Sequence, residues 1–254
     1  MIDIDNELFI IIPGFGGNNI NHKIEILQSN LNIIQSTWIC DKISIIIYVY
    51  DPDIIQLIPK ELFNNTNIKW IIQKGVVGNY LLQFQNEMKY SENSYLLILL
   101  DDVQLSNNVK LSKMVEYLNE FSFDIISPCL TANSKYQFNY MLHTSNNENA
   151  LFVTSACELF CYFMKSKTFK LKYSKYINET NPWMWGIDMM LYNYFKLKVA
   201  LINGMTMTHY YKNESYNETL PNPFEGQKIL FESYNTSMDE LSKQKAIRYV
   251  IYEM

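Results

Sequence analysis

The sequence contains no long apolar run, few cysteines and no surplus of positive charge. No segment reaches the ~18 apolar residues that a membrane-spanning helix needs, so we expect no transmembrane segment. The formal net charge of −5 disfavours binding along a nucleic-acid backbone, and we expect no nucleic-acid partner. The four cysteines lie in or beside apolar stretches, and Cys157 and Cys161 have no second Cys/His pair to complete a zinc site. Buried reduced thiols fit a cytoplasmic protein, which is our expectation.

Glycine and proline are also scarce, with 8 and 7 residues in a chain of 254. No Gly/Ser-rich or Pro-rich linker and no internal repeat divides the sequence. The acidic N-terminus leads into a short apolar run at 8–12, which predicts a first strand rather than a signal peptide. An apolar fraction of 48% is sufficient for a substantial core.

Apolar runs alternate with helical periodicity in the first half of the chain. The runs predict strands, and the apolar residues spaced three or four apart predict helices between them. The expected strands are 8–12, 43–49, 68–72, 95–100 and 124–127, and the expected helices cover 20–34, 77–88 and 111–121. Continuous apolar strands separated by amphipathic helices predict an α/β fold with a mostly parallel, Rossmann-related central sheet and helices on both faces.

The second half has shorter and less regular signals. We expect strands at 137–142, 151–155, 158–164 and 199–202, a lysine-rich helix or turn at 165–176, and a helix at 182–195. The tail from Asn213 is polar, and the spacing of Leu241, Ala246 and Val250 indicates a helix near its end. We interpret this half as an extension of the same domain.

Asp101 and Asp102 follow directly after the most hydrophobic predicted strand, in YLLILLDDVQLSNN. Two adjacent carboxylates repel each other unless a cation lies between them or one is protonated. A hard divalent ion such as Mg²⁺ or Mn²⁺ is the usual solution, with phosphate oxygens and water as further ligands. The alternative is a pair of turn acids before the next helix. The buried strand and its position at the carboxyl edge of the sheet favour a functional site.

The carboxyl ends of the other predicted strands carry further candidates for ligand binding. Asp51 is either a hydrogen-bond acceptor for a nucleobase or ribose, or a turn residue before Pro52. Gly14 belongs to PGFGGNN, which allows close backbone approach but does not spell the dinucleotide fingerprint. Lys74 and Gly75 precede a predicted helix, where a lysine and backbone N–H groups can meet phosphate, although an ordinary strand–helix turn explains them equally well.

Three candidates lie in the second half. Asp188 is expected in the first turn of a helix, where a carboxylate can act as general base for a hydroxyl group or simply complement the helix dipole. Trp183 and Trp185 could provide an apolar wall for a sugar ring, or belong to the core. His209 follows a predicted strand and could contact a metal or phosphate, although a single histidine is more often without such a role.

Taken in order, these motifs resemble nucleotide-sugar-dependent glycosyltransferases with the GT-A fold, and are similar to members found in plants, bacteria and large DNA viruses of algae. The segments that carry the resemblance are LLILLDDVQLS, CELFCYFMKSKTF, WGIDMML and THYYK. It implies a single GT-A-like catalytic domain at 1–212, with a nucleotide-binding half at 1–128 and an acceptor-side half at 129–212. Residues 213–254 would form a C-terminal helical tail.

The resemblance also implies roles for the metal and the base. An Asp-x-Asp motif holds Mn²⁺ or Mg²⁺ in this fold, and Asp102 matches its metal-binding Asp, with Asp101 beside it and Leu100 in place of the first Asp. His209 matches a late histidine that contacts the metal or the diphosphate. Asp188 matches the catalytic base of inverting members.

For the donor, the resemblance assigns Asp51 to the nucleoside and Pro13 and Gly14 to the loop near its base. It implies transfer of a hexose or pentose from a nucleoside-diphosphate sugar, with UDP favoured over GDP, to a hydroxyl of a glycan or glycoconjugate. Direct displacement with inversion is expected.

Two other interpretations stay open. A Rossmann-type cofactor-binding enzyme would use Asp51 as its ribose contact, but it leaves Asp101, Asp102 and the tryptophan-rich segment unexplained. A catalytically inactive sugar- or nucleotide-binding protein of the same fold is compatible with Leu100 in the acid motif.

Overall fold

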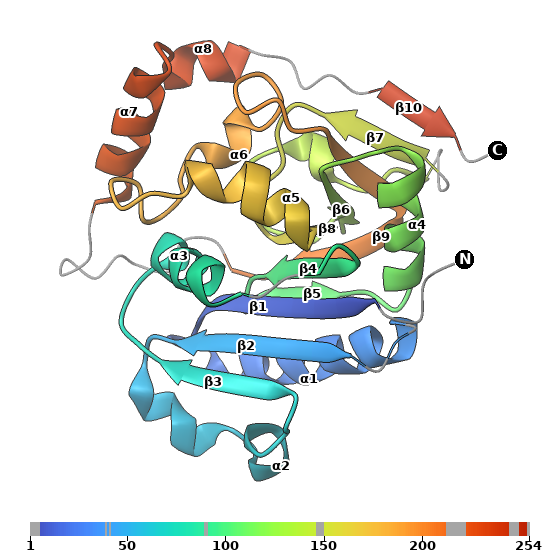
Figure 1. Cartoon of the computed structure of the whole chain (residues 1–254), viewed down its shortest axis with the longest axis vertical. Helices are drawn as coiled ribbons and strands as arrows, with labels where there is room; N and C mark the ends of the chain where they lie inside the picture. The colour runs from blue at the N-terminus through green and yellow to red at the C-terminus, as the bar shows by residue number, and fades with distance from the viewer. Residues whose placement is uncertain are drawn as a thin grey trace.

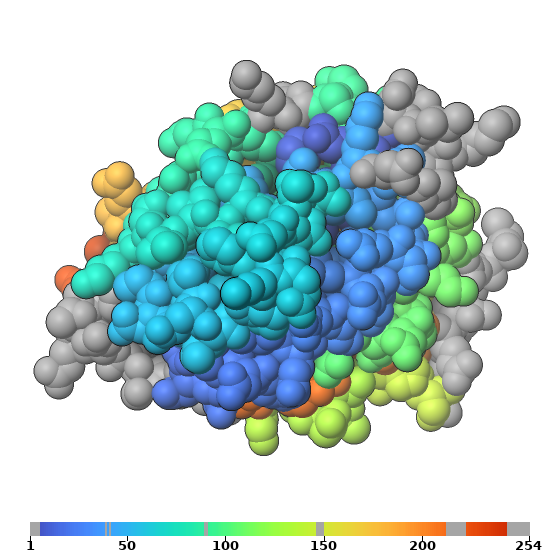
Figure 2. Space-filling model, turned by 90° about the horizontal axis from the view of Figure 1, so that it is seen from below, coloured from blue at the N-terminus to red at the C-terminus, as the bar shows by residue number. Residues whose placement is uncertain are grey.

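The computed structural model describes residues 6–38, 40, 42–88, 91–145, 150–211, 222–243 and 249–252. Its strands form one ten-stranded sheet that is packed between helices (Figure 1). Seen from below, the part of the chain coloured blue to cyan, which is the N-terminal part, makes up most of the visible face (Figure 2). Within the described residues, no helix combines the length and the apolar composition that crossing a membrane requires.

Four parallel strands form the N-terminal half of the sheet, in the order β3-β2-β1-β4. These strands are β1 (Glu7–Phe15), β2 (Ile43–Val49), β3 (Ile68–Ile72) and β4 (Ser94–Leu99). The connections include α1 (Ile20–Thr37) and α3 (Val77–Glu87). Right-handed crossovers place these two helices on opposite faces, because β1 leads to β2 in one direction and β3 leads back to β4 in the other. The strands and helices expected here are confirmed.

The second half extends the sheet beyond β4 with strands of both directions. These strands are β5 (Val103–Leu105), β6 (Ile125–Leu130), β7 (Ala150–Thr154), β8 (Cys161–Lys165), β9 (Val199–His209) and β10 (Tyr249–Tyr252). The full order is β10-β7-β9-β6-β8-β4-β1-β2-β3, with β5 paired to β9. Only β5, β7 and β8 run against the other described strands. The expected mostly parallel α/β sheet is therefore confirmed.

Short helices occupy the remaining connections. Between β2 and β3 lie η1 (Pro52–Leu57) and α2 (Lys60–Phe63). The others are α4 (Leu111–Glu120), η2 (Asn139–Met141), α5 (Ser166–Thr168), η4 (Phe169–Tyr173), η5 (Ser174–Tyr176), α6 (Ile187–Met190), α7 (Pro223–Ser233) and α8 (Met238–Lys243).

Three sequence-based expectations for the second half are wrong. The segment 137–142 is not a strand but contains the single turn η2. The helix expected at 182–195 shrinks to the one turn α6, because Gly186 and Met184 adopt positive φ and interrupt the helical path. The third expectation is wrong only in part: Leu241 lies in the helix α8 as expected, but Val250 lies in β10, which pairs with β7, and Ala246 lies outside the described residues. In addition, β9 is longer than expected and carries His209 at its end.

Strand β4 is buried along its whole length. Leu96, Leu97 and Ile98 are fully buried between β1 on one side and β8 on the other, with α5 packed against the strand. Each such side chain contributes roughly 1.5–3 kcal/mol of transfer free energy. The strand is therefore a rigid support for the two acids that follow it.

Candidate functional site

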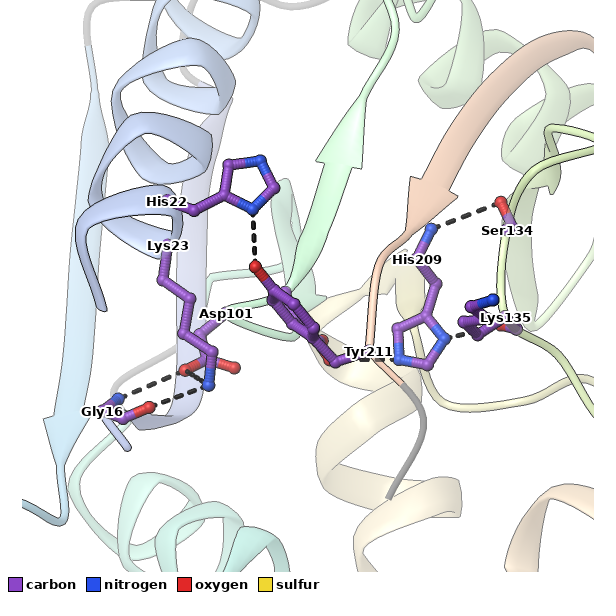
Figure 3. Close-up of polar contacts among 9 residues, drawn as sticks. Gly16, His22, Lys23, Asp101, Ser134, Lys135, His209 and Tyr211 are labelled. Atoms are coloured by element: carbon purple, nitrogen blue, oxygen red, sulfur yellow. Dashed lines mark hydrogen bonds and ion pairs between the residues drawn. The ribbon is translucent and has the colours of Figure 1, made fainter. Parts of the chain in front are cut away.

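Asp101 lies at the carboxyl edge of the sheet, where its carboxylate joins the end of β4 to the end of β1. Its Oδ2 accepts a hydrogen bond from Gly16 N at 3.2 Å and pairs with Lys23 Nζ at 3.1 Å (Figure 3). Lys23 Nζ also donates to the Gly16 carbonyl at 2.8 Å. Burial raises the pKa of Asp101 to about 7, and Asp102 adds to this shift, whereas Lys23 and the Gly16 N–H oppose it.

Asp102 faces the other way, towards the end of β9. Its Oδ2 lies 3.1 Å from His209 Nε2, and both side chains are largely buried. On the far side of the ring, His209 Nδ1 lies 2.6 Å from the Lys135 carbonyl (Figure 3). Phe160 stacks on the imidazole with ring centroids 4.1 Å apart, which holds the ring in this plane.

The hydrogen bond to Lys135 decides which nitrogen of His209 carries the proton. A carbonyl can only accept, so Nδ1 must donate, and Nε2 of the neutral ring presents a lone pair to the Asp102 carboxylate. Burial lowers the pKa of His209, but the hydrogen bond and charge of Asp102 outweigh it and the pKa is raised overall. The pair therefore attracts either a proton or a metal cation.

The chemistry of these two side chains suits a divalent ion. A carboxylate oxygen and an imidazole nitrogen held by an outer carbonyl are typical metal ligands. In the part of the chain that the structure describes, no cluster of three or more His, Cys, Asp or Glu side chains supplies a complete set. Further ligands would come from substrate phosphate and water, as is usual for Mg²⁺ in nucleotide sites.

The residues expected around a nucleoside lie together beside Asp101. Gly14 and Gly16 have φ of +112° and +147°, and a methyl group built on Gly16 would stand 3.2 Å from Asp51 Cβ. Pro13 is buried in β1, which continues through this segment to residue 15. The Asp51 carboxylate accepts a hydrogen bond from Asp53 N at 3.1 Å and caps η1, so Asp51 does act as a turn residue. Its side chain also lies beside the Gly16 backbone.

Lys74 and Gly75 lie in the loop between β3 and α3, with Lys74 exposed. Tyr80 joins this loop to β1, because its hydroxyl donates to the Gly75 carbonyl at 2.9 Å and its ring lies 3.6 Å from a methyl group built on Gly14. At the start of α3, the Gly78 N–H donates to Pro182 at 2.7 Å. Some amides at this helix N-terminus are thus already used within the protein.

Asp188 lies in α6, two residues after Gly186, which has a left-handed φ of +83°. Burial raises the pKa of Asp188 to about 7, and the nearby Glu158 carboxylate adds to the shift, while backbone N–H groups of Gly186, Asp188 and Met189 oppose it. Glu158 also raises the pKa of His209, so one carboxylate lies within electrostatic reach of both groups. A carboxylate with a pKa near 7 is suited to accept a proton at neutral pH.

Trp183 and Trp185 are half-buried beside α6. The Trp185 ring meets Phe224 of α7 edge-on, with centroids 5.0 Å apart, and Phe224 is 61% exposed. The tryptophan-rich segment, which precedes Asp188 in the chain, therefore contacts an exposed aromatic side chain of α7.

Gly186→Ala is expected to lower the free energy of unfolding by about 2–5 kcal/mol. A side chain at this positive φ costs about 1–2 kcal/mol, and the new Cβ would lie 2.6 Å from the Phe231 ring, where overpacking costs about 1–3 kcal/mol. Urea denaturation measures the loss. Gly204→Ala, at an exposed position of β9 without positive φ, is the matched control. A loss below about 1 kcal/mol for Gly186→Ala would contradict the assigned geometry.

Sequence reasoning missed two polar residues of this region. The available signal for Lys23 was its spacing, four residues before Leu27 and eight before Leu31, which places it on the apolar face of α1, where a lysine is buried only if it is paired. Glu158 lies in the turn before β8, where it accepts from Gln137 N at 2.8 Å and Phe138 N at 3.0 Å. No local pattern distinguishes it from other surface acids.

No family model and no curated protein sequence matches the chain. Solved structures are similar to it in fold. GalNAc-T7, solved with UDP, GalNAc and Mn²⁺, has a TM-score of 0.60 and 10% sequence identity over 93% of this chain and 50% of that one, so the chain spans half the length of that structure. TarS of S. aureus (residues 1–349), solved with UDP-GlcNAc, has a TM-score of 0.54 and 13% identity over 93% and 69%. The chain therefore has the GT-A-like fold of nucleotide-sugar glycosyltransferases.

Proposed function

We propose that the protein transfers a sugar from a nucleoside-diphosphate sugar to an acceptor hydroxyl. The observation that carries this proposal is the Asp102–His209 pair, 3.1 Å apart at the carboxyl edge of the sheet, with the histidine oriented by Lys135. In a GT-A-like fold this edge is where ligands bind. UDP is the favoured nucleotide of the donor, because the two similar structures contain UDP or UDP-GlcNAc.

In this proposal Asp102 and His209 hold Mn²⁺ or Mg²⁺. When bound, the ion supplies Lewis-acid neutralisation of the diphosphate leaving group. The protein's part is to keep His209 in the tautomer that offers Nε2, through the Lys135 carbonyl, and to hold the Asp102 side chain beside that nitrogen.

The nucleoside side of the proposed site is the wall formed by the ends of β1 and β2. Pro13 and Gly14 border the base, and Asp51 accepts hydrogen bonds from the base or ribose. Asp101 belongs to this wall through its contact with Gly16. Lys74 and Gly75 contribute from the loop after β3, where an exposed ammonium group can meet phosphate.

Asp188 is the proposed base. Its carboxylate takes the proton from the acceptor hydroxyl as the hydroxyl oxygen attacks the anomeric carbon and the nucleoside diphosphate leaves. Its raised pKa places the carboxylate close to the balance between basicity and ionisation that proton transfer at neutral pH needs. Trp183 and Trp185 line the acceptor side. A single displacement inverts the anomeric configuration, which NMR of the product tests.

A thermal-shift panel of UDP- and GDP-sugars, with and without Mn²⁺, tests the proposed function. We expect a UDP-sugar to raise the melting temperature only when Mn²⁺ is present, because ligand binding to the folded state stabilises it by mass action. Donor hydrolysis by the hits then separates an enzyme from an inactive binding protein. The absence of any nucleotide-dependent shift would contradict the proposal.

A further inference from the structure

Helix α1 presents two buried polar side chains to the segment that follows β4. Lys23 and Asn30 are 3% and 2% exposed. They lie two helical turns apart and therefore on one face. Asn30 donates to the Val103 carbonyl and accepts from Leu105 N, both at 2.8 Å, and so holds β5 against the helix. Lys23 does the same for the turn that precedes β5, by pairing with Asp101.

Three residues contact one another here, and each of them, Lys23, Asp101 and Gly16, binds the other two. Lys23 Nζ reaches Asp101 at 3.1 Å and the Gly16 carbonyl at 2.8 Å, and the Gly16 N–H reaches the same Asp101 oxygen at 3.2 Å. Figure 3 shows the lysine side chain extending from α1 to this point. Burying an ammonium group is costly unless it is paired. Lys23 therefore needs both Asp101 and the Gly16 carbonyl in order to be buried here.

The set also controls where the backbone of β1 lies. Gly16 has a φ of +147°, and its Cα is packed so closely against Asp51 and Tyr50 that a methyl group would stand 3.2 and 3.3 Å from them. The hydrogen bond to Asp101 and the one from Lys23 hold both polar groups of this glycine. The wall beside Asp51 therefore depends on an ion pair that originates in α1.

We propose that Lys23 is a positioning residue for the donor nucleotide. It keeps Asp101 turned towards Gly16, so that the two adjacent acids divide their roles: Asp101 shapes the nucleoside wall, and Asp102 alone faces His209. This inference rests on the proposed function for the identity of the ligand, but the ion pair and its effect on the Gly16 backbone do not.

The test combines nucleotide binding with hydrogen exchange in the full chain. Lys23→Met is expected to raise the Kd for UDP with Mn²⁺ by about tenfold or more, since a misplaced wall costs binding and orientation. It is also expected to speed amide exchange at Phe15 to Gly17, because the Gly16 N–H loses its oriented acceptor. In transfer assays KM should rise by a larger factor than kcat falls. Lys23→Arg keeps the positive charge and should bind UDP more tightly than Lys23→Met.

Lys172→Met is the control for the loss of a lysine–aspartate pair, because it removes a more exposed pair, with Asp124 at 2.7 Å, away from the described site. It should leave UDP affinity unchanged. If Lys23→Met does not fold, Lys23→Met combined with Asp101→Asn replaces the pair by neutral groups, and wild-type UDP affinity in this double variant would overturn the inference.

The outcomes separate the two proposals. If wild type does not bind UDP or another nucleotide, the proposed function fails, and the exchange measurement still decides whether Lys23 orders Gly16. If wild type binds UDP and Lys23→Met binds equally well with unchanged exchange, the inference about Lys23 fails and the proposed function stands.

Discussion

Asp188→Asn is expected to lower the rate of sugar transfer by about 10²- to 10⁴-fold, the usual contribution of a general base. Asparagine keeps the shape of the side chain in α6 but cannot accept the proton of the acceptor hydroxyl. UDP binding should remain unchanged, because Asp188 lies on the acceptor side of the proposed site. Single-turnover transfer and UDP calorimetry measure the two quantities separately.

The raised pKa of Asp188 predicts a pH profile with a definite sign. The base must be deprotonated to act, so kcat/KM of wild type should rise with pH up to about 7 and then level off. Stability should move in the opposite direction. A carboxyl whose pKa is higher in the folded state than in the unfolded chain stabilises the fold at low pH, and this contribution is lost as pH rises through about 7.

Asp188→Asn should therefore be more stable than wild type at pH 8 and nearly equal to it below about pH 4. The shift from 3.8 to about 7 sets an upper limit of about 4 kcal/mol, and we expect a smaller gain because Asp188 is partly exposed. Asp239→Asn, an exposed acid in α8, should change neither activity nor stability appreciably. If Asp188→Asn transfers sugar at a rate within about tenfold of wild type, Asp188 is not the base.

Asp102→Asn and His209→Gln are each expected to abolish the Mn²⁺-dependent part of donor binding. Each variant removes one of the two side chains that face each other at 3.1 Å. A 100-fold weaker UDP complex corresponds to a loss of about 2.7 kcal/mol of ligand stabilisation. For a chain of 254 residues this is a loss of roughly 5–10 °C in the UDP-induced melting shift.

His143→Gln is the control for the histidine variant. His143 also places Nδ1 2.7 Å from a backbone carbonyl, but that carbonyl belongs to Asn203, six residues before His209 in β9. Its UDP shift should equal that of wild type. If His209→Gln retained the full Mn²⁺-dependent shift while remaining folded, the metal assignment would be wrong.

The affinity for Mn²⁺ should also fall as the pH is lowered. A metal and a proton compete for Nε2 of His209, and the Asp102 carboxylate raises the pKa of this histidine above its ordinary value of 6.5. The loss of affinity should therefore begin at a higher pH than for an isolated histidine. Calorimetry with Mn²⁺ and UDP across the range of pH 6 to 8.5 measures it.

Much of the fold followed from the sequence. The strands β2 and β3 have the bounds that their apolar runs predict, and β4 leads into Asp101 and Asp102 as expected. Buried parallel strands are continuous apolar segments, so a local pattern is enough to locate them. The second half was harder, because turns with positive φ at Met184 and Gly186 shorten a helix that the apolar spacing alone would extend.

The candidate site divides in the same way. The sequence by itself determined that two acids follow a rigid strand and that Asp188 and His209 occur later in the chain. Only the tertiary structure decided that these two acids face different partners, Asp101 towards Lys23 and Asp102 towards His209. The reason is physical: Lys23 and His209 are 78 and 107 residues away from their respective partners in the sequence, and the α1 crossover and the pairing of β5 with β9 bring them together. Local patterns carry no information about such contacts.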